Sequence, residues 1–381
     1  MNLLVNLIPI KIGGGQQVAD NFVTQVLKDQ DIDPYFLVTE NSFIHRKLEQ
    51  KRVLKLFIVG VSLSKRFFFQ QFLLKKIIED NNIDLIYTLF GPGLHSSKVK
   101  SVTGCAYSNL FFPEIDFWKE YSRFERLKYK IIDYYRLKTT LKSHSIIFEN
   151  NAMRKRAISL FNYPEKRTKL ILPSISEYPE EPCSEELSSR LENINSKNFN
   201  ILLLSGWAKN KNIHMIPNIL NKLYLEEKKD VTFLITVSPN HPESVALRKR
   251  AVELGVEKGI IFFGSVLPTE VPFLYKNTSA SILLSKLESF SNTIIESWYF
   301  KKPLIISDEE WSREICGSAC VYVNRENAVD IAQKILLIKD NKTARVELEK
   351  RSVIKLEKYP SPQQKIVEQL NFLRQTAELI I

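Results

Sequence analysis

Cysteine is scarce in this sequence of 381 residues, and its four cysteines, Cys105, Cys183, Cys316 and Cys320, form no CxxC pair. The histidines near them do not supply metal-ligand spacing either. Zinc modules and dithiol redox motifs are built on such pairs, so both are excluded. We expect the four thiols to be free and to lie in the core.

Long hydrophobic runs are missing as well. Residues 67–74 form one of the longest, and Lys75 and Lys76 end it, whereas a bilayer-spanning helix needs about 20 apolar residues. No basic segment followed by a small-residue cleavage site opens the sequence, so no secretory signal is predicted. We expect a protein that stays in the cytoplasm, either free or at the inner face of the cell membrane.

Two familiar binding signatures are absent or misplaced. No GxGxxG motif follows the first strand, which argues against a nicotinamide dinucleotide enzyme. Asp29, Asp31 and Asp33 have the DxD spacing that some transferases use to hold a divalent metal. They stand between a predicted helix and a predicted strand, just before Pro34, where aspartate and proline are ordinary turn residues. We expect no metal and no cofactor.

The composition that remains is ordinary for a globular protein, with 44% hydrophobic and 25% charged residues. The net charge of +11 favours an anionic partner, which leaves nucleic acid, an anionic membrane surface and a phosphorylated substrate open. No RNA- or DNA-binding module accompanies the charge, so nucleic acid is disfavoured.

Short apolar strands alternate with amphipathic helices in both halves of the chain, a pattern typical of parallel sheets wrapped by helices. Residues 173–198 shift to proline, serine and glutamate, the composition of a surface linker. The sequence predicts an α/β protein of two doubly wound Rossmann-like domains. We divide it into a first domain at 1–175, a linker at 176–198, a second domain at 199–360 and a final helix at 361–381.

A run of three glycines, Gly13, Gly14 and Gly15, follows the first strand and precedes a helix. Backbone N–H groups at such a helix N-terminus can approach a phosphate closely. A purely structural tight turn would use the same residues. We take Gly14 and Gly15 as weak candidates for binding an anionic ligand.

Residues 262–323 carry the strongest signal. After a strand ending at Leu284, a loop holds Glu288, Ser289, Phe290, Ser291 and Asn292, and a helix beginning near Thr293 holds Glu296 in its first turn. Such a loop aims N–H groups and a positive helix end at a diphosphate, while two carboxylates accept hydrogen bonds from sugar hydroxyls. The segment predicts a site for an anion joined to a polyol.

This segment resembles the C-terminal domain of glycosyltransferase family 4, a retaining group with the GT-B architecture. Its E-x7-E signature stands here as Glu288-Ser-Phe-Ser-Asn-Thr-Ile-Ile-Glu296-Ser-Trp, followed by Lys302-Pro303-Leu-Ile-Ile-Ser307. The words FFGSV and VPFLY upstream also fit. The resemblance implies two Rossmann-like domains facing a cleft, with the final helix crossing back to the first domain, and use of a nucleotide-diphosphate sugar.

The resemblance also implies roles for particular residues. Glu296 would bind the ribose, and Glu288 would contact the donor sugar near the reacting carbon. Ser291, Asn292 and Thr293 would line the diphosphate. In the segment GWAKNKN, Lys211 would neutralise the departing diphosphate. The family's usual arginine has no clear counterpart; Lys209 is the candidate for its place, and a solvated lysine pair at a helix entry would look the same.

Two stretches of the first half, residues 84–93 and 104–114, resemble N-terminal words of the same family and would face the acceptor. Many relatives carry a histidine near the reacting centre. His95 is the nearest counterpart here, although an ordinary loop histidine would look the same.

Residues 118–144, from Trp118 at the start to His144 at the end, interleave eight lysines and arginines with six aromatics in a helical pattern. This helix could dock on an anionic bilayer and bring a lipid-linked glycan acceptor to the site. A solvated basic face over an aromatic core face would give the same pattern.

We therefore expect an enzyme that moves a sugar from a nucleotide-diphosphate sugar to an acceptor hydroxyl with retention, in the assembly of a bacterial surface polysaccharide. The rivals are a sugar-nucleotide epimerase or a phosphorylase of the same fold, and a catalytically silent relative that acts as a scaffold. The donor sugar, the nucleobase, the acceptor and the oligomeric state are not encoded in a readable pattern.

Overall fold

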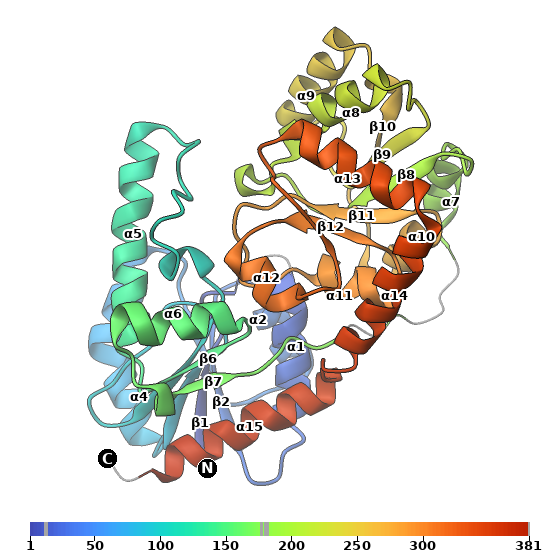
Figure 1. Cartoon of the computed structure of the whole chain (residues 1–381). Helices are drawn as coiled ribbons and strands as arrows, with labels where there is room; N and C mark the ends of the chain where they lie inside the picture. The colour runs from blue at the N-terminus through green and yellow to red at the C-terminus, as the bar shows by residue number, and fades with distance from the viewer. Residues whose placement is uncertain (11–13, 176–177, 179–182, 380–381) are drawn as a thin grey trace. The chain divides into compact units, whose positions relative to one another are not determined.

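A computed structural model describes residues 1–10, 14–175, 178 and 183–379. The chain divides into two compact units, Met1–Ser174 with Pro360–Ile381, and Ile175–Tyr359. Each unit is a parallel β-sheet with helices on both faces (Figure 1). The prediction of two Rossmann-like α/β domains is confirmed.

Unit 1 contains a sheet of seven strands in the order β3-β2-β1-β4-β5-β6-β7, and all neighbours are parallel. The strands are β1 (Asn2–Asn6), β2 (Asp33–Thr39), β3 (Leu56–Val59), β4 (Leu85–Thr88), β5 (Lys100–Cys105), β6 (Ser145–Phe148) and β7 (Thr168–Leu170). The helices are α1 (Gly14–Val26), α2 (Phe43–Gln50), α3 (Leu63–Phe68), α4 (Leu74–Asp80), α5 (Arg123–Leu141), α6 (Asn151–Phe161) and α15 (Pro362–Glu378).

The strands of this sheet are apolar on both faces because helices cover both. In β1, Leu3 and Val5 belong to one core cluster and Leu4 belongs to another. Side chains alternate along a strand, so the two clusters lie on opposite faces.

The final helix, α15, packs on α1, β4 and β5 of unit 1, as expected from the sequence. It begins at Ser361 with a capping box closed by Gln364 and with proline at its first position. Its Arg374 bonds the carboxylate of Asp29 at 2.5 Å. Asp29, part of the DxD-like spacing, is therefore engaged in holding the helix.

Unit 2 contains a sheet of six parallel strands in the order β10-β9-β8-β11-β12-β13. The strands are β8 (Phe199–Leu203), β9 (Val231–Ile235), β10 (Ile260–Phe262), β11 (Ala280–Leu283), β12 (Leu304–Ser307) and β13 (Val321–Val323). The helices are α7 (Glu185–Glu192), α8 (Ile216–Leu225), α9 (Pro242–Glu253), α10 (Val271–Lys276), α11 (Asn292–Tyr299), α12 (Glu310–Cys316), α13 (Ala328–Asp340) and α14 (Lys342–Leu356).

Part of the stretch expected to be a linker is helical. Helix α7 begins after Ser184, whose hydroxyl accepts from the N–H of Leu187, and Leu187 is fully buried against β8 and β9 residues of unit 2. Polar composition concealed this element, because one buried leucine and an N-cap serine suffice to dock a short helix.

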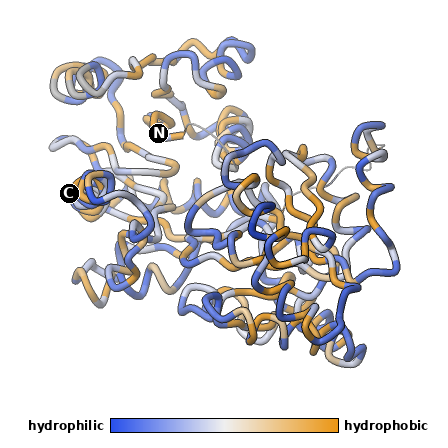
Figure 2. The backbone as a smooth tube through the Cα atoms, turned by 90° about the horizontal axis from the view of Figure 1, so that it is seen from above, coloured by the Kyte–Doolittle hydropathy of each residue, from blue (hydrophilic) through white to orange (hydrophobic). Residues whose placement is uncertain are grey.

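Within the described parts of the chain, no helix combines the length and the hydrophobicity that crossing a bilayer requires. Hydrophobic and hydrophilic residues alternate along the helices (Figure 2).

Candidate functional site

In unit 2 the strand order reverses between β8 and β11, which pair directly. The loop 204–212 leaves the carboxyl end of β8, and the loop 284–291 leaves the carboxyl end of β11. Ligands of open α/β sheets bind where the order reverses in this way. The candidate residues of the C-terminal half all lie on these two loops or on helix α11: Lys209, Lys211, Glu288, Ser291, Asn292, Thr293 and Glu296.

The two loops meet in an ion pair between Lys211 and Glu288. The Nζ atom of Lys211 donates to Oε1 of Glu288 at 2.5 Å, across 77 residues of sequence. The side chains are 20% and 13% exposed, so the pair is mostly buried and weakly screened. Lys209 lies on the same 3-10 turn and is exposed. The structure therefore brings Lys211 to Glu288 and leaves Lys209 at the surface.

Main-chain contacts fix this approach. The N–H of Lys286 donates to the carbonyl of Asn210 at 2.8 Å. Asn212 ends the lysine turn in the left-handed conformation, with φ of 56°, which asparagine adopts more readily than other non-glycine residues. Its side chain donates to the carbonyl of Arg325 at 2.6 Å. The position of Lys211 is thus set by the backbone on both sides of it.

Helix α11 starts beside this pair. Its N-cap residue, Ser291, makes no side-chain capping bond, and Asn292 at the first position is exposed. The hydroxyl of Thr293 donates to the carbonyl of Leu204 at 3.2 Å and ties the helix to the end of β8. A contribution of Thr293 to ligand binding would therefore come from its main-chain N–H.

Glu296 lies one turn further into α11 and is 8% exposed. Its Oε1 accepts from the hydroxyl of Tyr178 at 3.1 Å. Its Oε2 is enclosed and has no hydrogen-bond partner among the described residues. Burial raises the pKa of Glu296 to about 7, although the hydroxyls of Tyr178 and Tyr275 act to lower it. The carboxyl group is therefore poised between its charged and neutral forms.

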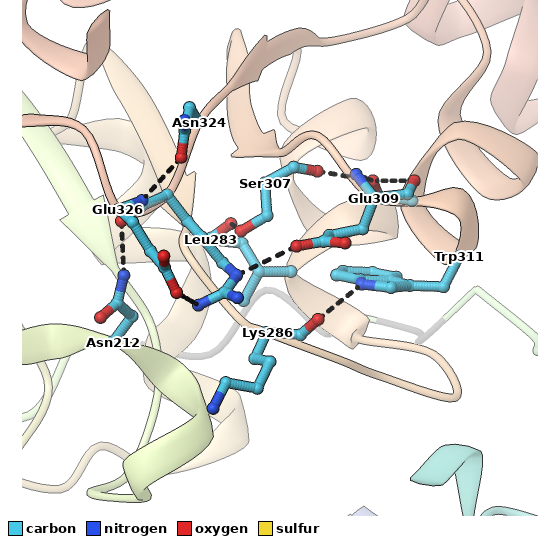
Figure 3. A network of polar contacts seen from close by, with 10 residues as sticks. Asn212, Leu283, Lys286, Ser307, Glu309, Trp311, Asn324 and Glu326 are labelled. Atoms are coloured by element: carbon cyan, nitrogen blue, oxygen red, sulfur yellow. Dashed lines mark hydrogen bonds and ion pairs between the residues drawn. The ribbon is translucent and has the colours of Figure 1, made fainter. Parts of the chain in front are cut away.

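A second layer of polar contacts supports the loops (Figure 3). The guanidinium of Arg325 bonds Glu309 and Glu326, each at 3.0 Å. The indole N–H of Trp311 donates to the carbonyl of Lys286 at 3.3 Å. These contacts join the segments that follow β11, β12 and β13, so they hold the loop that carries Glu288 in position.

The candidates of the first half all belong to unit 1. Gly14 and Gly15 open helix α1, while Gly13 lies outside the described residues. A Cβ added at Gly15 would meet its nearest neighbour, Cγ2 of Ile10, at an ordinary 3.9 Å, so the fold itself does not demand glycine there. An anion-binding role of Gly14 and Gly15 stays a prediction.

His95 is engaged within the fold at both ring nitrogens. Nδ1 lies 3.1 Å from the hydroxyl of Ser101, and Nε2 lies 2.6 Å from the carbonyl of Thr139. Burial lowers the pKa of His95. These contacts join β5 to α5 through the His95 ring. A role of His95 in the chemistry stays a prediction.

Two residues near the site escaped the sequence analysis. Tyr178, the partner of Glu296, lies in the stretch interpreted as linker. Lys286 is 6% exposed and stands two residues before Glu288. Its position at the end of an apolar strand was the feature of the sequence that could have identified Lys286 as a site residue. No group of three or more potential metal-ligating side chains occurs in the portion of the chain that is described.

Comparison with known protein families matches residues 184–353 to the model described as glycosyl transferases group 1. This stretch spans most of unit 2 and contains every candidate residue of that unit except Tyr178. No curated protein sequence gives a match.

Solved structures match over the whole chain. A glycosyltransferase from Rickettsia africae superimposes with a TM-score of 0.73 at 16% identity, covering 100% of this chain and 99% of the other. HepE of Anabaena, in complex with UDP and glucose, gives 0.69 at 16% identity, covering 98% and 100%. WaaG, a glycosyltransferase involved in lipopolysaccharide biosynthesis, gives 0.67 at 13% identity, covering 96% and 98%. The chain thus has the fold of the GT-B glycosyltransferases, and its second unit matches the glycosyl transferases group 1 family over residues 184–353.

Proposed function

We propose that this protein is a retaining glycosyltransferase of the family 4 type, which transfers a sugar from a nucleoside-diphosphate sugar to an acceptor hydroxyl. The contact between Lys211 and Glu288 carries the proposal. It places a cation and a carboxylate together at the carboxyl ends of β8 and β11, beside the N-terminus of α11. A sugar joined to a diphosphate needs both kinds of group within a few ångströms.

The chemistry assigns a role to each group. Cleavage of the bond between sugar and phosphate leaves negative charge on the departing oxygen, which Lys211 and the N–H groups at Ser291 and Asn292 would stabilise. Glu288 would accept hydrogen bonds from the sugar, and Glu296 would accept them from the ribose. Because these groups meet the leaving-group charge, removal of divalent metals with EDTA should leave turnover unchanged.

Retention follows in the proposal from front-face attack. The leaving phosphate takes the proton of the acceptor hydroxyl while the new bond forms on the face that the phosphate vacates, so no covalent intermediate with the enzyme arises. The anomeric configuration of the product, read by NMR coupling constants, tests this point. An inverted product would overturn the assignment to a retaining mechanism.

The first experiment is a calorimetric screen of UDP, GDP and ADP and their common sugar conjugates, with Glu296→Gln as the comparison. UDP comes first, since HepE and TarM of Staphylococcus aureus are known in complex with it. Saturable binding that weakens in Glu296→Gln supports the site. No binding to any nucleotide would favour the silent scaffold, and conversion of the donor sugar without an acceptor would favour the epimerase.

The acceptor class is proposed as a glycan or lipid-linked glycan of a bacterial surface polysaccharide. WaaG and TarM support this choice, as WaaG is involved in lipopolysaccharide biosynthesis and a mutant of TarM was crystallised with Fondaparinux, alpha-GlcNAc-glycerol and UDP. Transfer of labelled sugar to a lipid extract of the source cells, but not to water-soluble oligosaccharides, would identify a lipid-linked acceptor.

Helix α5 supports docking on an anionic bilayer. Phe124, Leu127, Ile131, Tyr134 and Tyr135 are between 50% and 89% exposed, and their spacing of three and four residues places them on one face of the helix. Arg123, Lys128 and Lys130, which are exposed, lie to either side of this stripe, and the exposed Lys138 lies at its C-terminal end. An exposed apolar stripe between cations fits the boundary between acyl chains and anionic headgroups.

Vesicle co-sedimentation tests this surface. Binding to phosphatidylglycerol vesicles should exceed binding to phosphatidylcholine vesicles and should fall as salt rises. The double variant Phe124→Ser with Leu127→Ser should lose at least about ten-fold in affinity, because both side chains are worth more than 1.4 kcal/mol when buried. Leu160→Ser on α6, at a residue that is 51% exposed, is the control. Equal losses in both variants would refute the role of α5.

A further inference from the structure

Glu296 is the starting point, because it is a buried carboxylate with an incomplete set of partners. Oε1 accepts one bond, from Tyr178, and Oε2 accepts none from the described residues. A carboxylate can accept about four hydrogen bonds, and a buried one is costly to leave unsatisfied. The Glu296 carboxylate therefore has capacity to accept further hydrogen bonds, such as those from hydroxyl groups of a ligand.

Tyr178 is held in place from the other side. Its ring packs on Tyr299, with centroids 5.4 Å apart, and on Phe300 at 5.2 Å. The ring of Phe300 in turn stacks on Tyr275 at 4.9 Å. This aromatic cluster fixes the direction in which the hydroxyl of Tyr178 points, so its bond to Glu296 does not depend on a mobile side chain.

We propose that Tyr178 is a positioning residue for donor binding: by donating to Oε1 it orients the Glu296 carboxylate and keeps it ionised for the hydroxyl groups of the nucleotide. The inference rests on the proposed function of Glu296. It adds a residue that lies outside the segment matching the glycosyltransferase family.

Few titratable groups of the described residues lie on the elements packed around Glu296. Tyr275 on α10 presents a second hydroxyl, and β11 and β12 carry no ionisable residue. Helix α14 also packs on α11, but its Glu349 pairs with Lys301 and its Lys355 acts on Cys316. Tyr178 and Tyr275 are thus the described groups that favour the charged carboxylate against its burial.

Nucleotide affinity should depend on pH through the ionisation of Glu296. An ionised carboxylate is the stronger acceptor, so nucleotide affinity should be full above pH 7 and should fall as the pH drops through about 7. Loss of the Tyr178 hydroxyl removes a bond that favours ionisation, which raises the pKa of Glu296. The midpoint of the affinity profile should therefore move to higher pH in Tyr178→Phe.

The experiment measures nucleoside-diphosphate dissociation constants from pH 5.5 to 9 in wild type and in three variants. Tyr178→Phe should weaken binding about five- to ten-fold at pH 7 and regain most of it at pH 9. Tyr299→Phe, which removes a hydroxyl from the same aromatic cluster, should match wild type. Glu296→Gln should bind weakly with a flat profile.

Different outcomes would overturn the role of Tyr178 and the proposed function of Glu296. A Tyr178→Phe profile identical to wild type, or a loss of equal size at every pH, would overturn the role of Tyr178 as a positioning residue. Wild-type affinity in Glu296→Gln, or no nucleotide binding by wild type at any pH, would instead overturn the proposed function. Thermal unfolding of each variant confirms that the compared proteins are folded.

Discussion

Replacing Lys211 by methionine removes the charge that faces Glu288 and keeps most of the length of the side chain. If Lys211 neutralises the leaving diphosphate, the variant should bind nucleoside diphosphates more weakly and bind the bare nucleoside as well as wild type does. A charge-assisted hydrogen bond contributes about 1.5–3 kcal/mol. Lys211 already bonds Glu288 at 2.5 Å, so its charge is divided between Glu288 and the diphosphate. We therefore expect the lower end of this range, which is a loss of about ten-fold in affinity for the diphosphate.

Replacing Glu288 by glutamine should act in the opposite direction on binding. The change removes the carboxylate that competes for Lys211, so the affinity for nucleoside diphosphate should stay equal or rise a few-fold. Turnover should fall by about a hundred-fold or more, because a group that acts on the transition state is lost. The double variant should bind nucleoside diphosphate as weakly as Lys211→Met alone.

Calorimetry with the nucleoside and its diphosphate, and initial rates of diphosphate release, measure these changes. The ion pair is 20% and 13% exposed at its two side chains, so either single change should also cost about 1–2 kcal/mol of stability. Diphosphate binding that weakens equally in both single variants would refute the division of roles. So would wild-type turnover in Lys211→Met.

Two predictions concern the fold of unit 1, and urea unfolding measures both. Gly104→Ala would place a Cβ 2.0 Å from the carbonyl oxygen of Leu89, so it should destabilise by at least about 3 kcal/mol, and a loss below 1 kcal/mol would contradict the close approach of β4 and β5. Lys365→Met should cost about 3 kcal/mol, because it leaves the mostly buried carboxylate of Glu149, which Lys365 bonds at 2.5 Å, without its cation. Lys169→Met, which breaks an exposed pair with the same helix, should cost less than about 1 kcal/mol. Equal costs would show that burial of the pair does not matter.

The alternation of strands and helices could be predicted because apolar periodicity survives in many of these elements, although β5, α13 and α14 were not predicted. The apolar run at 145–148 predicts a strand and is β6 without a shift, and the helical pattern at 150–161 predicts a helix and is α6. Strands β3, β5, β7 and β13 were not predicted. Strands β7 and β13 have only three residues each, and so short a run shows little periodicity. Helix α7 was missed because polar residues outnumber its single buried leucine.

The site could be predicted where its residues lie close together in sequence. Glu288 and Glu296 share one loop and one helix, and their surroundings form a continuous word. The contact of Lys211 with Glu288 spans 77 residues and depends on β8 and β11 being neighbours, which the spacing of the residues does not predict. For His95 the sequence offered only a suitable residue type in a loop, and the contacts of its ring with Ser101 and Thr139 could not be predicted from that.

The buried carboxylate of Glu296 predicts that a bound nucleotide raises the free energy of unfolding of unit 2. Unit 2 holds a carboxylate at Glu296 whose burial raises its pKa to about 7 and whose Oε2 has no partner among the described residues. Such a group lowers the free energy of unfolding, because water would solvate it in the unfolded chain. A nucleotide that donates to it removes that cost in addition to the stabilisation that any ligand gives by mass action. The gain should therefore be largest above pH 7, where the carboxylate is charged.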